Sequence, residues 1–398
     1  MRDLFAEQVR AGFLRILAFS IPKSYPGATG VITKKGKNLM KQLTGSTDRR
    51  NFLKNVSLAG AAAPFLFGTA RTGGIFSKKR SLIKPPRLKR GDAIGLVTPA
   101  SGPFEASTIW KTQARLENLG FTVKLGRHIS ENYGYLAGSD QDRAEDLHKM
   151  FQDASIHAII ALRGGYGSGR LLPYLDFDLI RKHPKILIGY SDITSLLLMI
   201  YKLSGLVTFH GPVAVSDFTD YTQKYFWQLL TSTRPAGAID FPKPDDPLLP
   251  ANQTWVIHGG QATGELVGGN LTLVCASLGT PYEVETKGKI LFLEDTEEEP
   301  YSLDRMFTQL DNAGKLKDAA AIALGHCANC GPREFNPGFN RTLSVEEVYK
   351  DRLGHLKKPV LADLPIGHLH DKITVPLGIR ATIDADKRQF IFEEAAVV

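Results

Sequence analysis

The chain has 398 residues, of which 49 are Lys or Arg and 41 are Asp or Glu, so its formal net charge at pH 7 is +8. The basic excess lies in residues 1–90, which hold 19 Lys and Arg against 3 Asp and Glu and leave 30 basic and 38 acidic residues for the rest. An acidic body argues against nucleic acid or an anionic membrane as the partner. Its length and the 43% hydrophobic content of the chain suffice for two domains with separate cores.

The first 70 residues have the features of an export signal. Arg49 and Arg50 form a twin-arginine pair, and an apolar run at residues 56–70 follows, with Gly68 and Ala70 near its end. The run is shorter than the roughly 20 residues of a membrane-spanning helix, so we expect a signal that is removed after transport. The alternative is a buried helix. The pattern predicts a periplasmic protein, and because no lipobox cysteine directly follows the run we expect no lipid anchor and no stable membrane anchor.

The position of this signal is unusual, because twin arginines normally lie close to the start of a chain. A start at Met40 would place the pair about ten residues from the N-terminus, the usual distance for such signals. We therefore expect translation to begin at Met40, with residues 1–39 either untranslated or a disordered extension. Residues 71–91 are expected to form a linker to the body.

Expected strands and helices alternate from residue 92 to residue 230. The strands are expected at 93–97, 122–125, 158–162 and 185–190, and the helices at 105–119, 140–151 and 192–200. This alternation is typical of a parallel sheet covered by helices, so we predict an α/β domain of the Rossmann or flavodoxin-like kind.

A Pro- and Asp-rich stretch at residues 231–254 is expected to link this domain to a second one at residues 255–398. The second domain is richer in strands, with a buried strand at 289–293, a helix at 302–310 and a further strand that begins at residue 360. We expect an α/β protein of two domains with the active site at their interface.

The junction at Ser191 is the first candidate for chemistry. A buried strand at 185–190 precedes it and a helix follows it, so the hydroxyl would stand on a sharp turn beside a helix N-terminus, as in a nucleophile elbow. The flanking Tyr190 and Asp192, with Ile193 in place of a second glycine, differ from the Gly-x-Ser-x-Gly of α/β-hydrolases. The alternative is a helix N-cap, which is the more common role of a serine in this position.

A carboxylate and a histidine follow two later strands. Glu294 ends the strand at 289–293, and His368 follows the strand that begins at residue 360. Parallel α/β sheets form their sites at strand ends, and a serine, a histidine and a carboxylate are the groups needed for nucleophilic acyl transfer. His210 is a rival base, although a role in shaping the site is favoured. Residues 297–299 are expected to be a solvated turn, one of whose glutamates could compete with Glu294.

Two motifs invite cofactor or metal interpretations that the residues do not support. The glycine-rich stretch at 164–169 lacks the Lys-Ser/Thr ending of a phosphate-binding loop. Cys327 and Cys330, with His326 and Cys275 as further candidates, lack the second ligand pair that a structural zinc site needs. We therefore expect no cofactor and no metal. Cys327 and Cys330 are expected as buried thiols, with a disulfide as the alternative.

Six motifs stand in the order in which one family of peptidases carries them, within residues 88–390: 162–172, 189–194, 208–212, 268–271, 293–305 and 367–368. On these residues the chain resembles the LD-carboxypeptidases, which comprise murein tetrapeptide carboxypeptidases and microcin-immunity peptidases. The resemblance implies a serine peptidase with Ser191, Glu294 and His368 as its triad. It also implies an oxyanion hole formed by the backbone N–H groups of Gly165 and Asp192, and no metal.

The resemblance implies a substrate as well. The family cleaves the bond between the L-centre of a diamino acid and a terminal D-alanine, so the expected partners are peptidoglycan-derived peptides. A carboxypeptidase must recognise a terminal carboxylate, and Arg163 and Arg170 are both candidates for that contact, while Tyr166, Tyr190 and His210 are candidates for other substrate contacts. Dimers are common in the family, so a homodimer is a further expected partner.

Two other functions remain open. The first is a related peptidase or amidase that acts on peptide-nucleotide antibiotics, which the expected export disfavours because such toxins act inside the cell. The second is a protein that binds peptidoglycan peptides without cleaving them. That function would be expected with a damaged triad, whereas all three triad positions hold the expected residues.

Overall fold

The computed structural model describes residues 80–244, 246 and 248–398. All of these described residues belong to one compact unit of the chain. The twin-arginine pair and Met40 lie outside the described residues, so the expectations about export and translation start stay predictions. No helix in the described part is long and apolar enough to cross a membrane.

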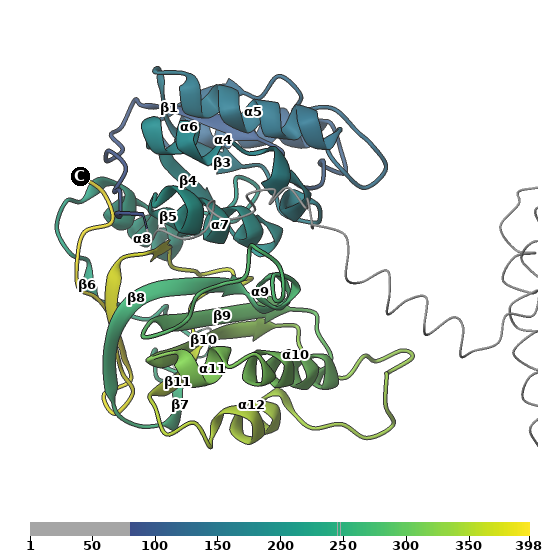
Figure 1. The fold of residues 1–398 in the computed structure, drawn as a ribbon, viewed down its shortest axis with the longest axis vertical. Helices are drawn as coiled ribbons and strands as arrows, with labels where there is room; N and C mark the ends of the chain where they lie inside the picture. The colour runs from purple at the N-terminus through teal and green to yellow at the C-terminus, as the bar shows by residue number, and fades with distance from the viewer. Residues whose placement is uncertain (1–79, 245, 247) are drawn as a thin grey trace, which may run out of the picture. The chain divides into compact units, whose positions relative to one another are not determined.

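The first sheet has six strands in the order β12-β5-β4-β3-β1-β2 (Figure 1). Its parallel strands are β1 (Ala93–Val97), β2 (Thr122–Leu125), β3 (Ile156–Ala161), β4 (Ile186–Gly189) and β5 (Thr208–His210). The order 2-1-3-4-5 is that of flavodoxin-like doubly wound sheets, as the alternating pattern predicts. The sixth strand, β12 (Val375–Leu377), pairs antiparallel with β5. It comes from the C-terminal part of the chain, which we expected to belong wholly to the second domain.

Helices accompany this sheet along the chain. They are α4 (Ser107–Asn118), α5 (Asp140–Gln152), α6 (Phe177–Lys182), α7 (Thr194–Ser204) and α8 (Asp220–Thr231), with short 3₁₀ helices η1 (Ser168–Tyr174) and η2 (Ser191–Ile193). Helix α4 contacts β2, α5 contacts β1 and β3, and α7 contacts β4 and β5. Parallel strands that are covered by helices are buried, which is why all four residues of β4 are apolar or glycine and buried.

The second sheet has eight strands in the order β6-β14-β13-β8-β9-β10-β11-β7. Its strands are β6 (Gly237–Ala238), β7 (Trp255–His258), β8 (Gln261–Asn270), β9 (Ile290–Thr296), β10 (Ala321–Ala328), β11 (Val360–Leu364), β13 (Arg380–Asp384) and β14 (Gln389–Phe392). The four strands β8 to β11 run parallel, and the remaining pairings are antiparallel. The helices of this part are α9 (Leu271–Ala276), α10 (Pro300–Asn312), α11 (Lys315–Asp318) and α12 (Val345–Leu353).

Helix α7 connects the two sheets. Nine of its residues are buried, and it contacts β8 of the second sheet as well as β4 and β5 of the first. Such extensive burial is expected of a helix with apolar side chains on most of its surface. The helix ends at Gly205, which has a φ of 79°. At the other end of α7, the Thr194 hydroxyl accepts a 3.0 Å hydrogen bond from the N–H of Asn270, the last residue of β8. The start of α7 is therefore fixed against both sheets.

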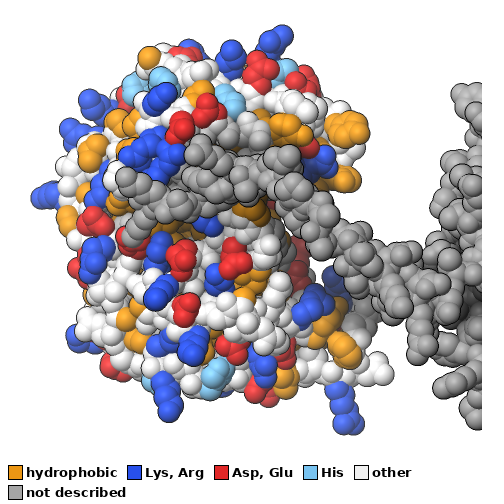
Figure 2. Space-filling view, viewed as in Figure 1, with side chains coloured by type: hydrophobic (Ala, Val, Ile, Leu, Met, Phe, Trp, Pro, Cys, Tyr) orange, Lys and Arg blue, Asp and Glu red, His pale blue; other side chains and the backbone are white. Residues whose placement is uncertain are grey.

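The surface carries charges of both signs. Figure 2 shows basic and acidic side chains interspersed over the visible face. This mixture agrees with the 30 basic and 38 acidic residues that the sequence places after residue 90.

Candidate active site

Ser191 follows β4 directly and opens the 3₁₀ turn that leads into α7. Its φ of 62° lies in the left-handed region, which residues other than glycine rarely adopt. Such strain is typical of a nucleophile elbow. The Ser191 side chain is half-buried and makes no hydrogen bond to any described residue. The N-cap interpretation is therefore wrong, and the hydroxyl is available for chemistry.

The glycine-rich loop lies against this serine. A Cβ atom added to Gly164 would stand 2.9 Å from Cβ of Ser191. Gly165 has a φ of 108°, and a Cβ there would meet Ser101 Oγ at 2.5 Å, so only glycine fits. Among the described residues, the N–H groups of Gly165 and Asp192 donate no hydrogen bond. One of these donors thus lies in the loop next to Gly164, and the other directly follows Ser191; an oxyanion hole requires two such donors.

Asp192 fixes the loop to the turn. Its carboxylate accepts a 2.7 Å hydrogen bond from the Ser168 N–H, and its carbonyl accepts a second bond from the Ser168 hydroxyl. Both residues are buried. These bonds leave the Asp192 N–H free while they hold the residue in place.

Glu294 and His368 form a hydrogen-bonded pair. Glu294, near the carboxyl end of β9, is 3% exposed, and its Oε2 accepts a 2.7 Å bond from Nδ1 of His368. Gly367 has a φ of 104°, and a Cβ there would lie 2.3 Å from Glu294 Oε2, so glycine permits the close approach. Because an ionised carboxylate can only accept, the proton resides on Nδ1 and leaves Nε2 as the basic atom.

A second histidine faces the other oxygen of Glu294. Nε2 of His210 lies 3.5 Å from Glu294 Oε1, and both atoms are buried without a hydrogen-bond partner in the described part of the chain. Burial raises the pKa of Glu294, but contacts with His210 and His368 outweigh it and lower the pKa to about 2. Glu294 is therefore ionised at neutral pH. His210 is 1% exposed and directed at a carboxylate, so it supports Glu294 and is poorly placed as a base.

Tyr190 connects Ser191 to the Glu294–His368 pair. Its ring packs edge-on against His368, with centroids 4.7 Å apart, and Tyr190 is the residue before Ser191. Lys372 also lies near this ring, with its Nζ 5.9 Å from the Tyr190 ring centroid. This lysine is 4% exposed, and burial lowers its pKa. The sequence analysis missed Lys372, although it follows the Gly367-His368 motif by only a few residues.

The two candidate arginines have different surroundings. Arg170 is paired with Asp140 through bonds of 3.1 and 2.9 Å, so its charge is already compensated. Arg163 has no carboxylate partner among the described residues, and its guanidinium carbon stands 4.3 Å from the centroid of the Phe104 ring. Phe104 is 93% exposed. Arg163 therefore has the less compensated charge of the two arginines.

A cavity of about 290 Å³ lies beside the glycine loop. Its lining includes Asp192, Ser195, Tyr166, Arg170 and Tyr282. Tyr166 is 54% exposed at its edge. This cavity borders the Ser191 turn and has the volume for one amino-acid side chain of a peptide.

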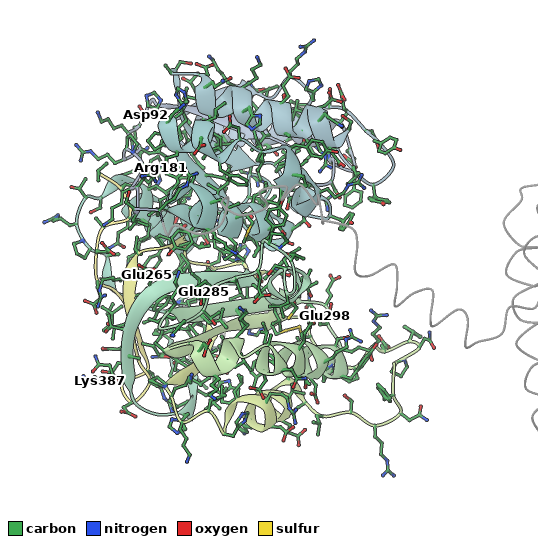
Figure 3. The ribbon with its side chains drawn as sticks, in the orientation of Figure 1. Asp92, Arg181, Glu265, Glu285, Glu298 and Lys387 are labelled. Atoms are coloured by element: carbon green, nitrogen blue, oxygen red, sulfur yellow. A yellow bond between two sulfur atoms is a disulfide. The ribbon has the colours of Figure 1, made fainter. Side chains whose placement is uncertain are left out.

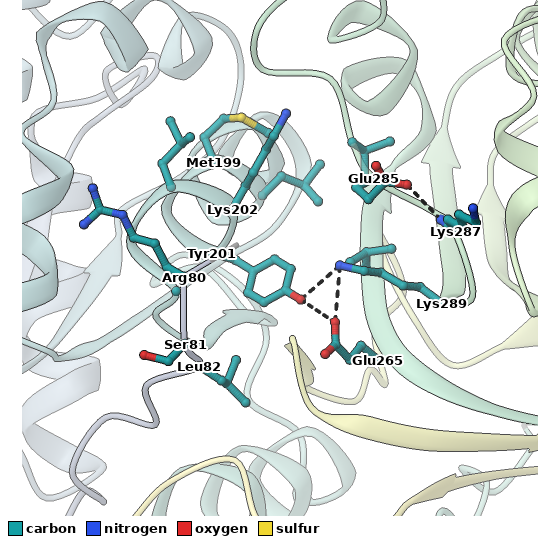
Figure 4. Close-up of a pocket in the computed structure, with 15 residues that line it drawn as sticks. Arg80, Ser81, Leu82, Met199, Tyr201, Lys202, Glu265, Glu285, Lys287 and Lys289 are labelled. Carbon is teal, nitrogen blue, oxygen red and sulfur yellow. Dashed lines mark hydrogen bonds and ion pairs between the residues drawn. The ribbon is translucent and has the colours of Figure 1, made fainter. Parts of the chain in front are cut away.

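A larger cavity of about 750 Å³ lies toward the other end of α7 (Figure 4). In it the Tyr201 hydroxyl donates a 3.0 Å bond to Glu265, and Lys289 Nζ donates a 3.1 Å bond to the same hydroxyl. None of the candidate site residues lines it. The larger cavity is thus distinct from the Ser191 site.

Two expectations near the site are corrected. Cys327 and Cys330 form a disulfide instead of remaining thiols, and this pairing removes them as zinc ligands. The turn after β9 is only partly solvated, because Glu299 is 6% exposed and accepts a 2.8 Å bond from the N–H of Gly338. Glu298, labelled in Figure 3, precedes it in this turn. Among the described residues, Glu294 is hydrogen-bonded to His368, whereas the glutamates at 297–299 have no hydrogen bond to it.

The chain is similar to known carboxypeptidases and to a solved structure. Family models described as the LD-carboxypeptidase N-terminal and C-terminal domains match residues 94–211 and 263–383. A Bacillus subtilis protein named "Probable murein peptide carboxypeptidase" is 41% identical, over 80% of this chain and 96% of its own. The murein tetrapeptide carboxypeptidase of Pseudomonas aeruginosa is 33% identical over 74% and 94%. The structure of the microcin C7 self-immunity protein MccF is 27% identical, covers 79% of this chain and 100% of its own, and has a TM-score of 0.71.

Proposed function

Since the chain belongs to the LD-carboxypeptidase family, we propose that it is a serine carboxypeptidase of peptidoglycan tetrapeptides. The reaction is hydrolysis of the bond between the L-centre of a diamino acid and a C-terminal D-alanine. One observation carries the proposal: an unpaired Ser191 hydroxyl on a left-handed turn, next to the ring that packs against the Glu294–His368 pair.

The proposed reaction begins with Ser191. His368 Nε2 takes the proton of the hydroxyl as Oγ attacks the carbonyl carbon, and Glu294 stabilises the imidazolium that forms. The N–H groups of Gly165 and Asp192 bind the oxyanion of the tetrahedral intermediate. His368 then protonates the leaving amine of D-alanine, and the acyl group remains on Ser191. Water, deprotonated by His368, hydrolyses this ester and restores the serine.

Recognition of the C-terminus is assigned to a cation. Arg163 can form a bidentate pair with the substrate carboxylate, because no carboxylate of the described residues occupies it. The small cavity bordered by Tyr166 and Asp192 is the proposed place for the side chain of the diamino acid. Its lining carries hydroxyl groups, such as those of Tyr166 and Ser195, for a polar side-chain end.

The test is whether the full chain releases D-alanine from a murein tetrapeptide, with mass spectrometry as the readout. A matched peptide ending in L-alanine reports stereospecificity, and Ser191→Ala reports the nucleophile. We expect release from the D-peptide alone, no release by Ser191→Ala, and retained peptide binding by that variant in calorimetry. Release by Ser191→Ala at the parent rate would disprove the assignment of the nucleophile.

The same assay separates the two alternative functions. Binding of the tetrapeptide by the parent chain without turnover would favour a peptide-binding protein. Turnover of an aminoacyl sulfamoyl nucleoside with none of the tetrapeptide would favour an antibiotic-inactivating peptidase. That second substrate is chosen because a solved structure of MccF contains aspartyl sulfamoyl adenosine.

A further inference from the structure

A cluster of possible metal ligands lies outside the site described above. Among the described residues, His128, Asp142 and Glu145 each offer one ligand atom, and these atoms all lie within 4.8 Å of one another. His128 belongs to the segment after β2, whereas Asp142 and Glu145 lie on α5. Residues spaced by three positions share one face of a helix, so both carboxylates face the same side of α5.

The histidine is oriented for this role. Its Nδ1 is hydrogen-bonded to Glu131 Oε1 at 2.6 Å, which places the free lone pair on Nε2. Nε2 faces Asp142 Oδ1 at 3.9 Å and is buried without a hydrogen-bond partner. A carboxylate that holds the second ring nitrogen is the usual arrangement around metal-bound histidines. A buried polar atom without a partner requires an explanation, and an ion between the three side chains supplies one.

We propose that His128, Asp142 and Glu145 bind a divalent transition-metal ion such as Zn²⁺. One imidazole nitrogen and two carboxylates suit such an ion, whereas Mg²⁺ and Ca²⁺ prefer oxygen ligands alone. Zn²⁺ ligands lie about 2.0–2.2 Å from the metal, so the carboxylates must move inward slightly from their present separation. The other oxygen of Asp142, Oδ2, accepts a 2.6 Å bond from the Ser139 hydroxyl, so Oδ1 is the oxygen left to bind the ion.

The ion would act on structure and not on the peptidase chemistry. It would join the segment at 126–138 to α5, and this segment carries Tyr135. The Tyr135 ring contacts the Tyr166 ring, with centroids 5.6 Å apart, and Tyr166 follows the Gly165 of the oxyanion hole. Metal binding is therefore expected to stabilise the folded chain and this side of the site together.

The test is calorimetric titration of the untagged, chelator-treated full chain with Zn²⁺. We expect 1:1 binding, a rise in Tm with Zn²⁺, and a loss of at least tenfold in affinity for both His128→Ala and Glu145→Gln. Glu131→Gln should weaken binding by about 10–100-fold, because it removes the orienting carboxylate. Circular dichroism and D-alanine release without Zn²⁺ check that each variant is folded.

The matched control is His355→Ala. His355 also has a carboxylate at 3.9 Å, from Asp311, but both side chains are exposed, and among the described residues they belong to no group of three possible metal ligands. Its removal should leave the affinity unchanged. The proposal is overturned if the parent chain binds no Zn²⁺, or if His128→Ala and Glu145→Gln bind it as tightly as the parent does. Either result would identify the cluster as an ordinary ion pair of His128 with its neighbouring carboxylates.

Discussion

Oε2 of Glu294 and Nδ1 of His368 are 2.7 Å apart, while the other oxygen of Glu294 faces His210. This one hydrogen bond fixes both the tautomer and the orientation of the His368 ring. We expect Glu294→Gln to lower kcat for D-alanine release by roughly 10²–10⁴-fold, the range of general acid–base effects. KM should change little, because the carboxylate is buried and touches no substrate.

The measurement for Glu294→Gln is steady-state kinetics on the tetrapeptide. Glu297→Gln is the matched control, since Glu297 is exposed and lies three residues further along the chain, directly after β9. It should retain the parent kcat. A kcat for Glu294→Gln within threefold of the parent would show that another group orients His368.

The depressed pKa of Glu294 has a consequence for stability. Its pKa falls from an ordinary value of 4.5 to about 2, because contacts with the two histidines outweigh burial. A lowered folded-state pKa stabilises the fold above the unfolded value, and this stabilisation is lost as pH falls through the folded value. The contribution of Glu294 should thus be complete above about pH 4.5 and decline between pH 4.5 and 2.

This effect is measured by urea unfolding of the parent and Glu294→Gln between pH 7 and pH 3. The difference in unfolding free energy should be constant from pH 7 to pH 5 and then change in favour of the variant. A difference that stays constant down to pH 3 would contradict the lowered pKa. Glu297→Gln again serves as the control.

Removal of Arg163 tests how the substrate carboxylate is recognised. Arg163→Ala should raise KM at least tenfold with a smaller effect on kcat, because a charge-assisted bidentate pair is lost. Arg163→Lys should restore little, since an ammonium group cannot form the planar fork. A tetrapeptide ending in D-alaninamide should bind the parent as weakly as the acid binds Arg163→Ala.

Arg170→Ala is the comparison for this experiment, because Arg170 is already paired with Asp140. We expect Arg170→Ala to lower Tm, because the ion pair with Asp140 is lost, and to raise KM only slightly. Equal increases in KM for Arg163→Ala and Arg170→Ala would show that Arg163 is not the specific partner of the substrate carboxylate. Lys372, buried beside Tyr190, would then be the next residue to substitute.

Sequence patterns predicted the first sheet well and one of its edges poorly. Strands such as β4 read as apolar runs with turn residues at their ends, and those ends also located Ser191 and Glu294. The strand β12 has only three residues and pairs with β5 from far along the chain. A segment so short has no periodicity, so no local pattern assigned it to the first sheet.

The cations and cysteines show a second limit of the sequence. The sequence does not distinguish Arg163 from Arg170, because only the fold places Asp140 next to one of them, Arg170. The disulfide between Cys327 and Cys330 depends on the backbone path after β10, which spacing alone does not determine. Lys372 stands in no strand-end pattern, because its importance comes from burial beside Tyr190.

Export by the twin-arginine route is a prediction that concerns residues outside the described part. We propose that Arg49 and Arg50 direct the folded protein to the periplasm, because the pair precedes an apolar run with small residues at its end. Arg49→Lys with Arg50→Lys should leave the full-length precursor in the cytoplasm, detected by fractionation and immunoblotting. Arg71→Lys, beyond the run, is the charge-matched control and should be exported and shortened like the parent. Equal export of the double variant and the parent would rule out this route, whereas a mature N-terminus near residue 71, read by mass spectrometry, would support it.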